Sequence, residues 1–331
     1  MSIRDVAKLA QVSYQTVSRV LNGSPSVRPA TRQRVLDAVV ALDFRPNRAA
    51  RALAGRRSYT IGVLATVSPA YYGPSSTMRG IEDAARDRGY SVLLANSRGT
   101  SAAELSAMLN HLVYQGVEGI IVLAPQAPAA HAATAMRKPV PVVMTQHDGG
   151  DPELSANDEL GGEMAARHLW ELGHRRLGHV AGPADWSETD VRRRGFEKAL
   201  AEVGSAPIVI GRGDWSADSG YEAFENVARH GVTGVFCAND QMALGFVHAA
   251  VDRGLNVPND LSVVGFDGVP EAAHYLPALT TMYLDFVALG RRAVERLLVI
   301  LRDGETAAHG AQEPILPQLI VRDSTARVSA A

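Results

Sequence analysis

The N-terminal 45 residues have the apolar spacing of short amphipathic helices. Three helices are predicted, over residues 3–10, 14–21 and 31–42. Ser13 and Thr31 are suitable N-caps for the second and third helices, and Asn22-Gly23 is expected to end the second. The side chains expected to form a shared core are Leu9, Val17, Val20, Val35, Val39 and Leu42. This segment is therefore predicted to be a small all-α domain.

From Tyr59 onward, short apolar runs alternate with amphipathic helical stretches. The runs cover residues 61–65, 91–95, 119–124, 140–144, 177–181, 208–210, 234–238 and 261–266. Strand and helix alternation of this kind is typical of parallel sheets covered on both faces, and the number of strands favours two sheets over one. A break near residues 155–157 predicts a passage between two lobes. A ligand is expected where the carboxyl ends of the strands face each other.

Charge is distributed unevenly along the chain. Residues 1–57 contain eleven Lys or Arg and three Asp or Glu, a net charge of +8, although the net charge of all 331 residues is −2. A basic N-terminal segment on an acidic remainder suits a protein that binds a polyanion through that segment.

Targeting signals and disulfides are not indicated. The N-terminus has no apolar run of the export type, and no stretch reaches the roughly 18 apolar residues that a membrane span requires. We expect a soluble cytoplasmic protein without membrane contact. The single cysteine, Cys237, lies in an apolar run and is interpreted as a core residue.

The second predicted helix has polar side chains suited to reading DNA. Tyr14 and Gln15 lie in its first turn and Arg19 lies one turn later, so that all three can project from one face into a major groove. With the preceding helix and the tight turn between them, this pattern predicts a helix-turn-helix and makes DNA recognition the leading hypothesis.

Motifs for catalysis and cofactor binding are missing. The run from Gly211 to Ser216 lacks the third glycine of a dinucleotide fingerprint, and neither a phosphate-binding loop nor a G-x-S-x-G elbow occurs. The ten histidines do not have the spacing of common metal sites; for His168, His174 and His179 surface or core roles are expected. The sequence predicts no enzyme, no cofactor and no metal.

Ordered segments along the chain resemble the lac repressor family, from residue 2 to about residue 325. The segments that carry the resemblance are Tyr14-Gln15-Thr16-Val17-Ser18-Arg19, Pro46-Asn47-Arg48, Leu53-Ala54-Gly55, Gly213-Asp214-Trp215-Ser216, Ala238 to Gly245, Ser262 to Asp267 and Leu279-Thr280-Thr281. The resemblance implies a helix-turn-helix head on a two-lobed, periplasmic-binding-protein-like α/β body with two parallel sheets. It also implies a transcriptional repressor controlled by a small ligand.

For the head, the resemblance implies that Tyr14, Gln15 and Arg19 read base edges. Backbone contacts are expected from hydroxyl and amide side chains, with helix capping as an alternative role: Ser13, Thr16, Ser18, Asn22 and Thr31. Gln11 occupies a turn position where the family usually has glycine, which implies slight strain if the backbone there is left-handed.

Residues 46–57 are predicted to be a hinge helix or linker. The Ala-rich segment from Pro46 to Gly55 is too short to be a stable free helix, so it would order against DNA and a partner copy. The resemblance implies minor-groove contacts from Asn47, Ala50 and Leu53, with Leu53 wedged into a base step.

The resemblance also implies an effector pocket in the body. The expected lining residues are Pro74, Gln146, Arg192, Trp215, Asn239, Asp267 and Phe286. Arg192, Asn239 and Asp267 are expected to come from three strand-end loops and to hold sugar hydroxyls, while Trp215 and Phe286 would form apolar walls. Of three consecutive arginines, only Arg192 is expected to point inward.

Several of these positions depart from the lac-type pattern. Gln146 stands in place of an acid, Leu123 and Leu284 replace amides, and Trp186 and Glu188 replace small hydroxyl residues, while Tyr71 and Tyr72 add aromatic rings beside Pro74. A sugar or glycoside effector fits, and a galactoside-like one is expected first. Another sugar, or a purine-type corepressor, is the alternative.

The domain boundaries expected are 1–45 for the head, 46–57 for the hinge and 58–331 for the effector-binding and dimerisation body, with lobe crossings near 156 and 284. A homodimer bound to double-stranded, near-palindromic operator DNA at the nucleoid is predicted, since the C-terminal residues lack leucine heptads. A sugar transport protein would share the body but would lack the head.

Overall fold

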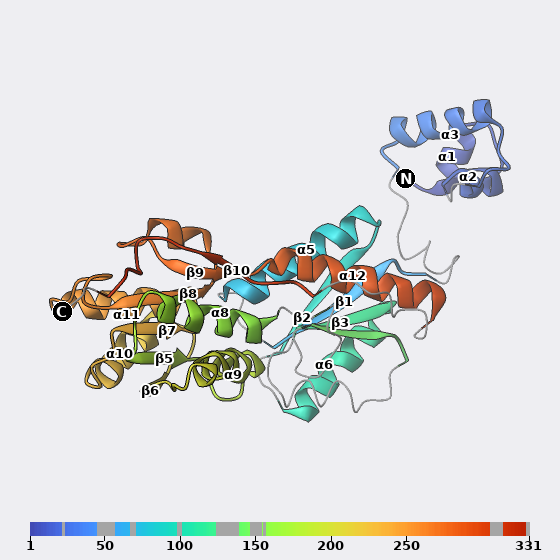
Figure 1. Ribbon diagram of the computed structural model, residues 1–331. Helices are drawn as coiled ribbons and strands as arrows, with labels where there is room; N and C mark the ends of the chain where they lie inside the picture. Colours follow the sequence, from blue (N-terminus) through green and yellow to red (C-terminus); the bar gives the residue numbers. More distant parts are fainter. Residues whose placement is uncertain are drawn as a thin grey trace. The chain divides into compact units, whose positions relative to one another are not determined.

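The computed structural model describes residues 1–21, 24–44, 57–66, 71–97, 101–123, 139–145, 154, 157–304 and 314–328. The chain divides into two compact units, Met1–Tyr59 and Thr60–Ala331 (Figure 1). Each is described by itself below.

The N-terminal unit consists of three helices, α1 (Ile3–Leu9), α2 (Tyr14–Leu21) and α3 (Pro29–Ala41). The predicted cap of α2 is confirmed, because the Ser13 hydroxyl accepts a hydrogen bond from the backbone N–H of Thr16 at 3.2 Å. The predicted cap of α3 is wrong. That helix begins at Pro29, whose fixed φ favours the first helical position, so Thr31 lies inside its first turn.

The core of this unit joins all three helices through small apolar side chains. Its buried members are Val6, Ala7, Ala10, Val17, Val20, Val35 and Ala38. Val39 and Leu42 pack against this core as predicted, but Leu9 is 53% exposed, because α1 turns Val6 and Ala10 inward instead. In the turn after α1, Gln11 has a left-handed backbone with a φ of 51°, the condition under which slight strain was expected.

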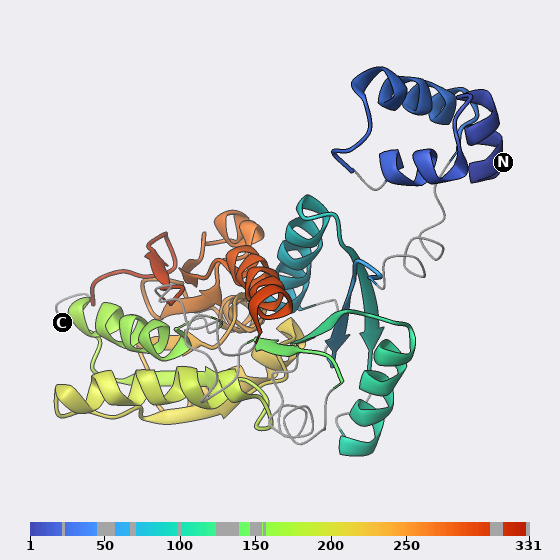
Figure 2. The ribbon, with the colours of Figure 1, turned by 90° about the vertical axis from the view of Figure 1, so that its right-hand side faces the viewer.

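The first sheet of the larger unit has four parallel strands in the order β2-β1-β3-β4. The strands are β1 (Thr60–Ala65), β2 (Ser91–Asn96), β3 (Gly119–Leu123) and β4 (Val142–Thr145). Two helices, α5 (Tyr72–Asp87) and α12 (Phe286–Asp303), pack on one face, and α6 (Ala102–Tyr114) covers the other (Figure 2). Alternation along β1 explains this, since Ile61 and Val63 face one layer and Leu64 faces the other.

The second sheet has six strands in the order β10-β9-β8-β7-β5-β6. They are β5 (Leu177–Ala181), β6 (Val209–Arg212), β7 (Gly234–Cys237), β8 (Ser262–Asp267), β9 (Thr280–Tyr283) and β10 (Gln318–Ile320). Helices α8 (Asp158–Glu171) and α9 (Ser187–Glu202) cover one face, and α10 (Ala217–Ala228) and α11 (Asp240–Asp252) cover the other. Cys237 is fully buried among α10 and α11, as predicted.

Two strands were not foreseen from the apolar runs. β9 contains two threonines and is parallel to β8, and the short β10 pairs with β9 in antiparallel orientation. The second sheet is therefore mixed and not wholly parallel, because its last strand reaches β9 after a return of the chain from α12.

The chain passes between the two lobes of the larger unit more than once. β4 belongs to the first sheet and β5 to the second; β9 belongs to the second, whereas α12 packs on the first and β10 returns to the second. Leu284 and Asp285 therefore separate a strand of one lobe from a helix of the other, and Asp285 caps α12 through the backbone N–H of Ala288 at 2.8 Å.

Reciprocal glycines bring paired helices into close contact. The pairs are Gly80 and Gly290 between α5 and α12, Gly162 and Gly195 between α8 and α9, and Gly220 and Gly245 between α10 and α11. A Cβ on Gly195 would lie 1.9 Å from the carbonyl oxygen of Glu159, closer than any side chain tolerates. The backbone contact thus fixes α9, the helix that carries Glu188 and Arg192.

Candidate functional site

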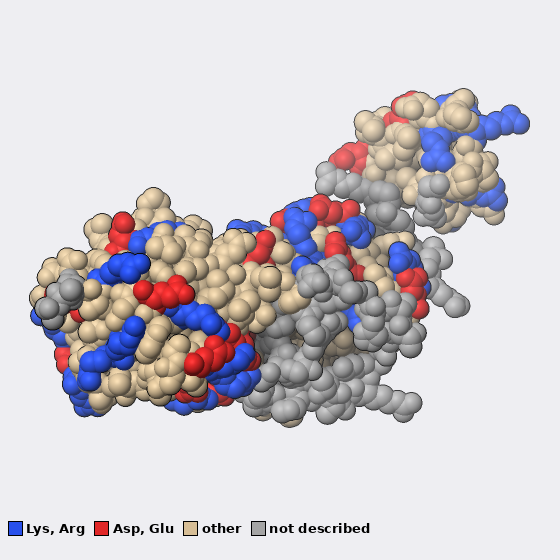
Figure 3. Space-filling view, viewed as in Figure 1, with Lys and Arg blue, Asp and Glu red and all other residues tan. Residues whose placement is uncertain are grey.

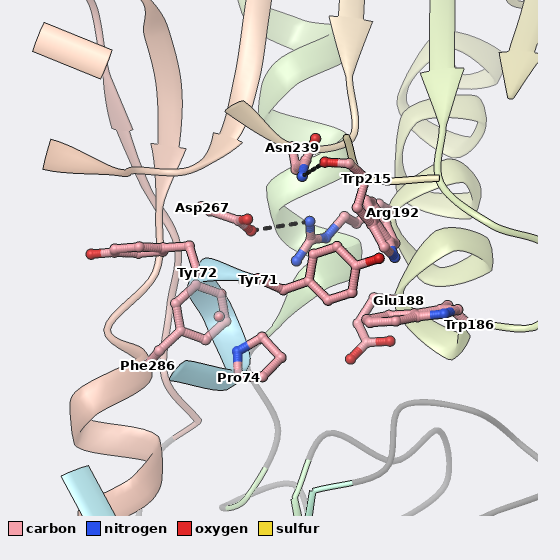
Figure 4. A pocket seen from close by; sticks show the side chains of 11 residues that line it. Tyr71, Tyr72, Pro74, Trp186, Glu188, Arg192, Trp215, Asn239, Asp267 and Phe286 are labelled. Carbon is pink, nitrogen blue, oxygen red and sulfur yellow. Dashed lines mark hydrogen bonds and ion pairs between the residues drawn. The ribbon is translucent and has the colours of Figure 1, made fainter. Parts of the chain in front are cut away.

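A pocket in the larger unit is lined by residues that follow strand carboxyl ends. It encloses about 390 Å³ of space free of protein atoms, part of it open to solvent. The lining residues come from the starts of α5, α9 and α12 and from the ends of β6, β7 and β8: Tyr71, Tyr72, Gly73, Pro74, Trp186, Glu188, Arg192, Trp215, Asn239, Asp267 and Phe286 (Figure 4). This is the position where parallel α/β sheets bind ligands.

Arg192 is the centre of a buried ion cluster in this pocket. Its Nε donates to Asp158 Oδ1 at 2.7 Å, and its Nη1 lies 3.2 Å from Asp267 Oδ1 and donates to the carbonyl of Ala238. The guanidinium also stacks over the ring of Phe266, with its carbon 3.7 Å from the ring centroid. Arg192 is 4% exposed, so the cluster lies in a medium of low dielectric constant.

The buried carboxyl groups in and beside the pocket have pKa values above those of ordinary carboxylic acids. Burial raises the pKa of Asp267 to about 6, against the opposing effect of Arg192. Burial raises the pKa of Glu188 to about 8, and the negative charge of Asp158 adds to this increase. The pKa of Asp158 itself is raised by burial, although Arg192 opposes the shift. One buried cation thus lies among three buried carboxyl groups.

Aromatic rings form another wall of the pocket. The rings of Tyr71 and Trp186 are 5.5 Å apart and nearly perpendicular, and Trp186 lies 5.4 Å from Trp215. The Tyr71 hydroxyl contacts the carbonyl of Asp214 at 3.5 Å. Tyr71 precedes α5 of the first lobe, whereas its partners belong to the second, so these contacts join the lobes across the pocket.

Trp215 is held in an uncommon backbone conformation. Its φ is 74°, and Asn239 supports the turn by donating from Nδ2 to the Trp215 carbonyl at 3.0 Å. Asn239 also caps α11, accepting from the backbone N–H of Met242 at 2.9 Å. The indole packs over Gly182, where a Cβ would lie 2.2 Å from the ring. The Nε1 of Trp215 is buried without a hydrogen-bond partner within the described chain.

Asp267 also has a left-handed backbone, with a φ of 100°. The following turn is held by buried Asp240, which accepts from the backbone N–H of Val269 at 2.8 Å and from the Thr281 hydroxyl at 2.6 Å. Two strained non-glycine residues at one pocket, each fixed by its own hydrogen bonds, are typical of a preorganised functional site.

Six of the seven expected effector residues line this one pocket: Pro74, Arg192, Trp215, Asn239, Asp267 and Phe286. Gln146 lies outside the described residues. Arg192 is in the second turn of α9 and not in a strand-end loop as expected, because α9 begins directly at the mouth of the pocket. Of the three consecutive arginines only Arg192 is buried, as expected. Leu123 and Leu284 are core residues that do not line the pocket.

One functional partner was missed by the sequence reasoning. Asp158, the first residue of α8, accepts a hydrogen bond of 2.7 Å from the Nε of Arg192, which lies 34 positions away in the chain. No motif marks it, and only the packing of α8 on α9 brings the two residues together.

The second helix of the N-terminal unit presents the side chains expected to read DNA. Tyr14, Gln15 and Arg19 are exposed, while Val17 and Val20 of the same helix are buried on the opposite side. On the visible face, both Lys or Arg and Asp or Glu side chains occur over this unit, and both signs of charge are interleaved over the larger one (Figure 3).

The residues expected at the DNA backbone have different local roles. The hydroxyls of Ser13 and Thr16 are 2.9 Å apart at the start of α2, Ser18 is half-buried, and Thr31 lies in the first turn of α3. Asn22 and the hinge residues Asn47, Ala50 and Leu53 lie outside the described residues.

Comparison with known proteins identifies both units. The family of bacterial regulatory proteins of the lacI type matches residues 2–47, and the periplasmic binding protein-like domain matches residues 166–325. The chain is 36% identical to the lactose operon repressor of Escherichia coli (strain K12) over 330 residues, 98% of this chain and 90% of that protein. It is 36% identical to catabolite control protein A of Priestia megaterium over 316 residues, 92% and 94% of the two chains.

Solved structures agree with this assignment. A lac repressor dimer bound to operator and the anti-inducer ONPF is similar with a TM-score of 0.88 and 34% identity, over 98% of this chain and 99% of that one. A complex of the transcriptional regulator CelR with cellobiose has a TM-score of 0.69 and 29% identity, with the same coverage. The chain belongs to the LacI family and is a ligand-responsive transcriptional repressor of that family. Members of this family are DNA-binding regulators and not enzymes.

The described ranges hold no membrane-spanning helix and no cluster of metal ligands. No helix there has both the length and the apolar character to cross a membrane, and no three His, Cys, Asp or Glu side chains are grouped to hold a metal ion.

Proposed function

We propose that this repressor binds a near-palindromic operator as a homodimer and releases it when a sugar or glycoside occupies the pocket. The observation that supports this most directly is the buried cluster of Arg192 and Asp267 beside the Trp215 ring. Charged groups fixed in a cavity offer donors and acceptors for hydroxyls, and an aromatic face stacks on the apolar face of a sugar ring.

A galactoside-like effector is the first candidate. Two relatives support a sugar, since one is a lactose operon repressor and another is a transcriptional regulator, CelR, in complex with cellobiose. Arg192, Asn239 and Asp267 are proposed to hold the hydroxyls, Pro74 and Phe286 to close the apolar side, and Gln146 to contribute a further polar group. Another sugar remains the alternative within this proposal.

Operator reading is proposed for the exposed face of α2. Arg19 suits a bidentate contact with guanine, and Gln15 offers one donor and one acceptor to a base edge, beside Tyr14. Phosphate contacts are proposed for the hydroxyl and amide side chains Ser13, Thr16, Ser18, Asn22 and Thr31. Minor-groove contacts are proposed for Asn47, Ala50 and Leu53.

The two activities are proposed to be coupled through the two lobes. In this proposal residues 1–45 read DNA, 46–57 form the hinge and 58–331 bind effector and the partner copy. Tyr71 joins the lobes across the pocket, so an occupant that changes this contact changes how the lobes meet. Coupling of about 1–3 kcal/mol would alter operator affinity about 5- to 150-fold. Such a protein would act at the nucleoid in the cytoplasm.

A titration of the protein–operator complex with a panel of glycosides tests the proposal. Mobility shift should show release by at least one galactoside or glucoside, and the same ligand should raise the melting temperature of the protein. If no sugar changes operator affinity while a purine strengthens it, the effector assignment is wrong and a corepressor mechanism takes its place.

A further inference from the structure

Glu188 is a carboxyl group of the pocket that forms no ion pair with any other described residue. It lies in the first turn of α9, is 7% exposed and lines the cavity (Figure 4). Its Oε2 accepts a hydrogen bond from the Ser187 hydroxyl at 3.3 Å. Among the described residues, no Lys, Arg or His forms an ion pair with it.

The nearby guanidinium of Arg192 already has other partners. Arg192 pairs with Asp158 and Asp267 and donates a further hydrogen bond to a carbonyl. With Arg192, Asp158, Asp267 and Glu188 all ionised, these four described side chains would place one positive charge among three negative charges in a buried site. Glu188 therefore remains neutral near pH 7 in the empty pocket, consistent with its pKa of about 8.

The aromatic rings beside Glu188 also favour the binding of a positively charged group in the pocket. Tyr71, Trp186 and Trp215 line the same cavity, with neighbouring ring centroids 5.5 and 5.4 Å apart. Aromatic faces attract cations, and the attraction grows when the cation is removed from water. Glu188 has no ion pair within the described ranges, and several aromatic rings surround the same cavity; these are two independent features that suit an ammonium group.

We infer that the effector is an amino sugar or amino glycoside, whose ammonium group pairs with Glu188 between the aromatic rings. The inference rests on the proposed function of the pocket and narrows its ligand class. A neutral sugar would leave Glu188 protonated, whereas an ammonium group would pair with its carboxylate once the carboxyl proton is released to solvent.

The test compares galactosamine with galactose and N-acetylgalactosamine, and glucosamine with glucose and N-acetylglucosamine, on the full-length protein bound to operator. Half-maximal release is measured by fluorescence anisotropy at pH 7. The amino sugar should act at a concentration about tenfold lower than its neutral counterparts, a factor equal to about 1.4 kcal/mol. The Glu188→Gln variant should lose this preference. The matched control Glu202→Gln, at the exposed end of the same helix, should keep it.

The outcomes separate this inference from the proposed function. Equal or stronger action of neutral sugars, or a preference that persists in Glu188→Gln, overturns the inference while leaving a sugar-responsive repressor. Release by no sugar, charged or neutral, overturns the proposed function and the inference with it.

Discussion

Replacement of Arg192 by methionine should be the most destabilising single change in the pocket. The guanidinium lies 2.7 Å from Asp158 and 3.2 Å from Asp267, and all three side chains are less than 10% exposed. Removing one partner of a buried ion cluster leaves uncompensated charge, which costs about 3–5 kcal/mol. Against the 5–15 kcal/mol that stabilises a typical domain, the loss is large.

Urea unfolding at pH 7 measures this loss, because Trp170, Trp186 and Trp215 all report on the larger unit. The matched control is Arg193→Met, whose ion pairs with Asp190 and Glu197 lie at the surface and are worth about 1 kcal/mol or less. Without Arg192, the pKa values of Asp158 and Asp267 rise further in the folded state.

The sign of the pH dependence follows from that rise. An acid with a higher pKa in the folded state favours folding while protonated, so stability falls as pH rises toward the folded pKa. The deficit of Arg192→Met relative to wild type should therefore shrink as pH is lowered from 7 toward 4. Equal losses for the two arginine variants, or a deficit that does not change with pH, would refute the reasoning.

Three further changes have defined outcomes. Arg19→Ala should relax preference at one base pair in each half-site, at a cost of about 1–3 kcal/mol, in a binding assay with single-base operator variants; a uniform loss would make Arg19 a phosphate contact. Glu188→Gln should raise the free energy of unfolding, measured in urea, by about 4 kcal/mol over wild type at pH 8 and by almost nothing near pH 4.5, since the folded pKa of about 8 exceeds the ordinary value of 4.5. Gly195→Ala should lower the free energy of unfolding by more than about 2 kcal/mol in thermal unfolding, because its Cβ would meet the carbonyl of Glu159. The control Ala201→Gly on the same helix should lower it by about 1 kcal/mol. Similar losses for both variants would contradict the close helix contact.

Apolar spacing was enough to predict most strands of the larger unit. β1 to β8 each coincide with or overlap one of the predicted apolar runs, and β5 has the predicted limits. β9 was missed because Thr280 and Thr281 are polar by composition yet fully buried, with the Thr280 backbone N–H bonded to Ser324 from 44 positions away. Pairings of this range depend on tertiary structure and leave no local pattern.

Sequence motifs predicted several of the residues that line the pocket, whereas other residues reach it only through the packing of the helices. Trp215, Asn239 and Asp267 lie in short segments that carry the family resemblance, and the structure groups them around one cavity. Asp158 was not found because its role depends on the close approach of α8 to α9, which Gly162 permits. The exposure of Leu9 has a similar cause, since the angle at which three short helices pack decides which apolar side chains turn inward.

The central claim is that one chain couples a sugar pocket to a DNA-binding head, and reciprocity tests it most directly. The affinity of the effector identified by titration is measured with free protein and with protein saturated by operator, and operator affinity is measured with and without the effector. Thermodynamic linkage requires the same factor in both directions, expected between about 5 and 150. Operator should weaken effector binding by the factor with which effector weakens operator binding. Equal effector affinity for free and operator-bound protein would contradict the account.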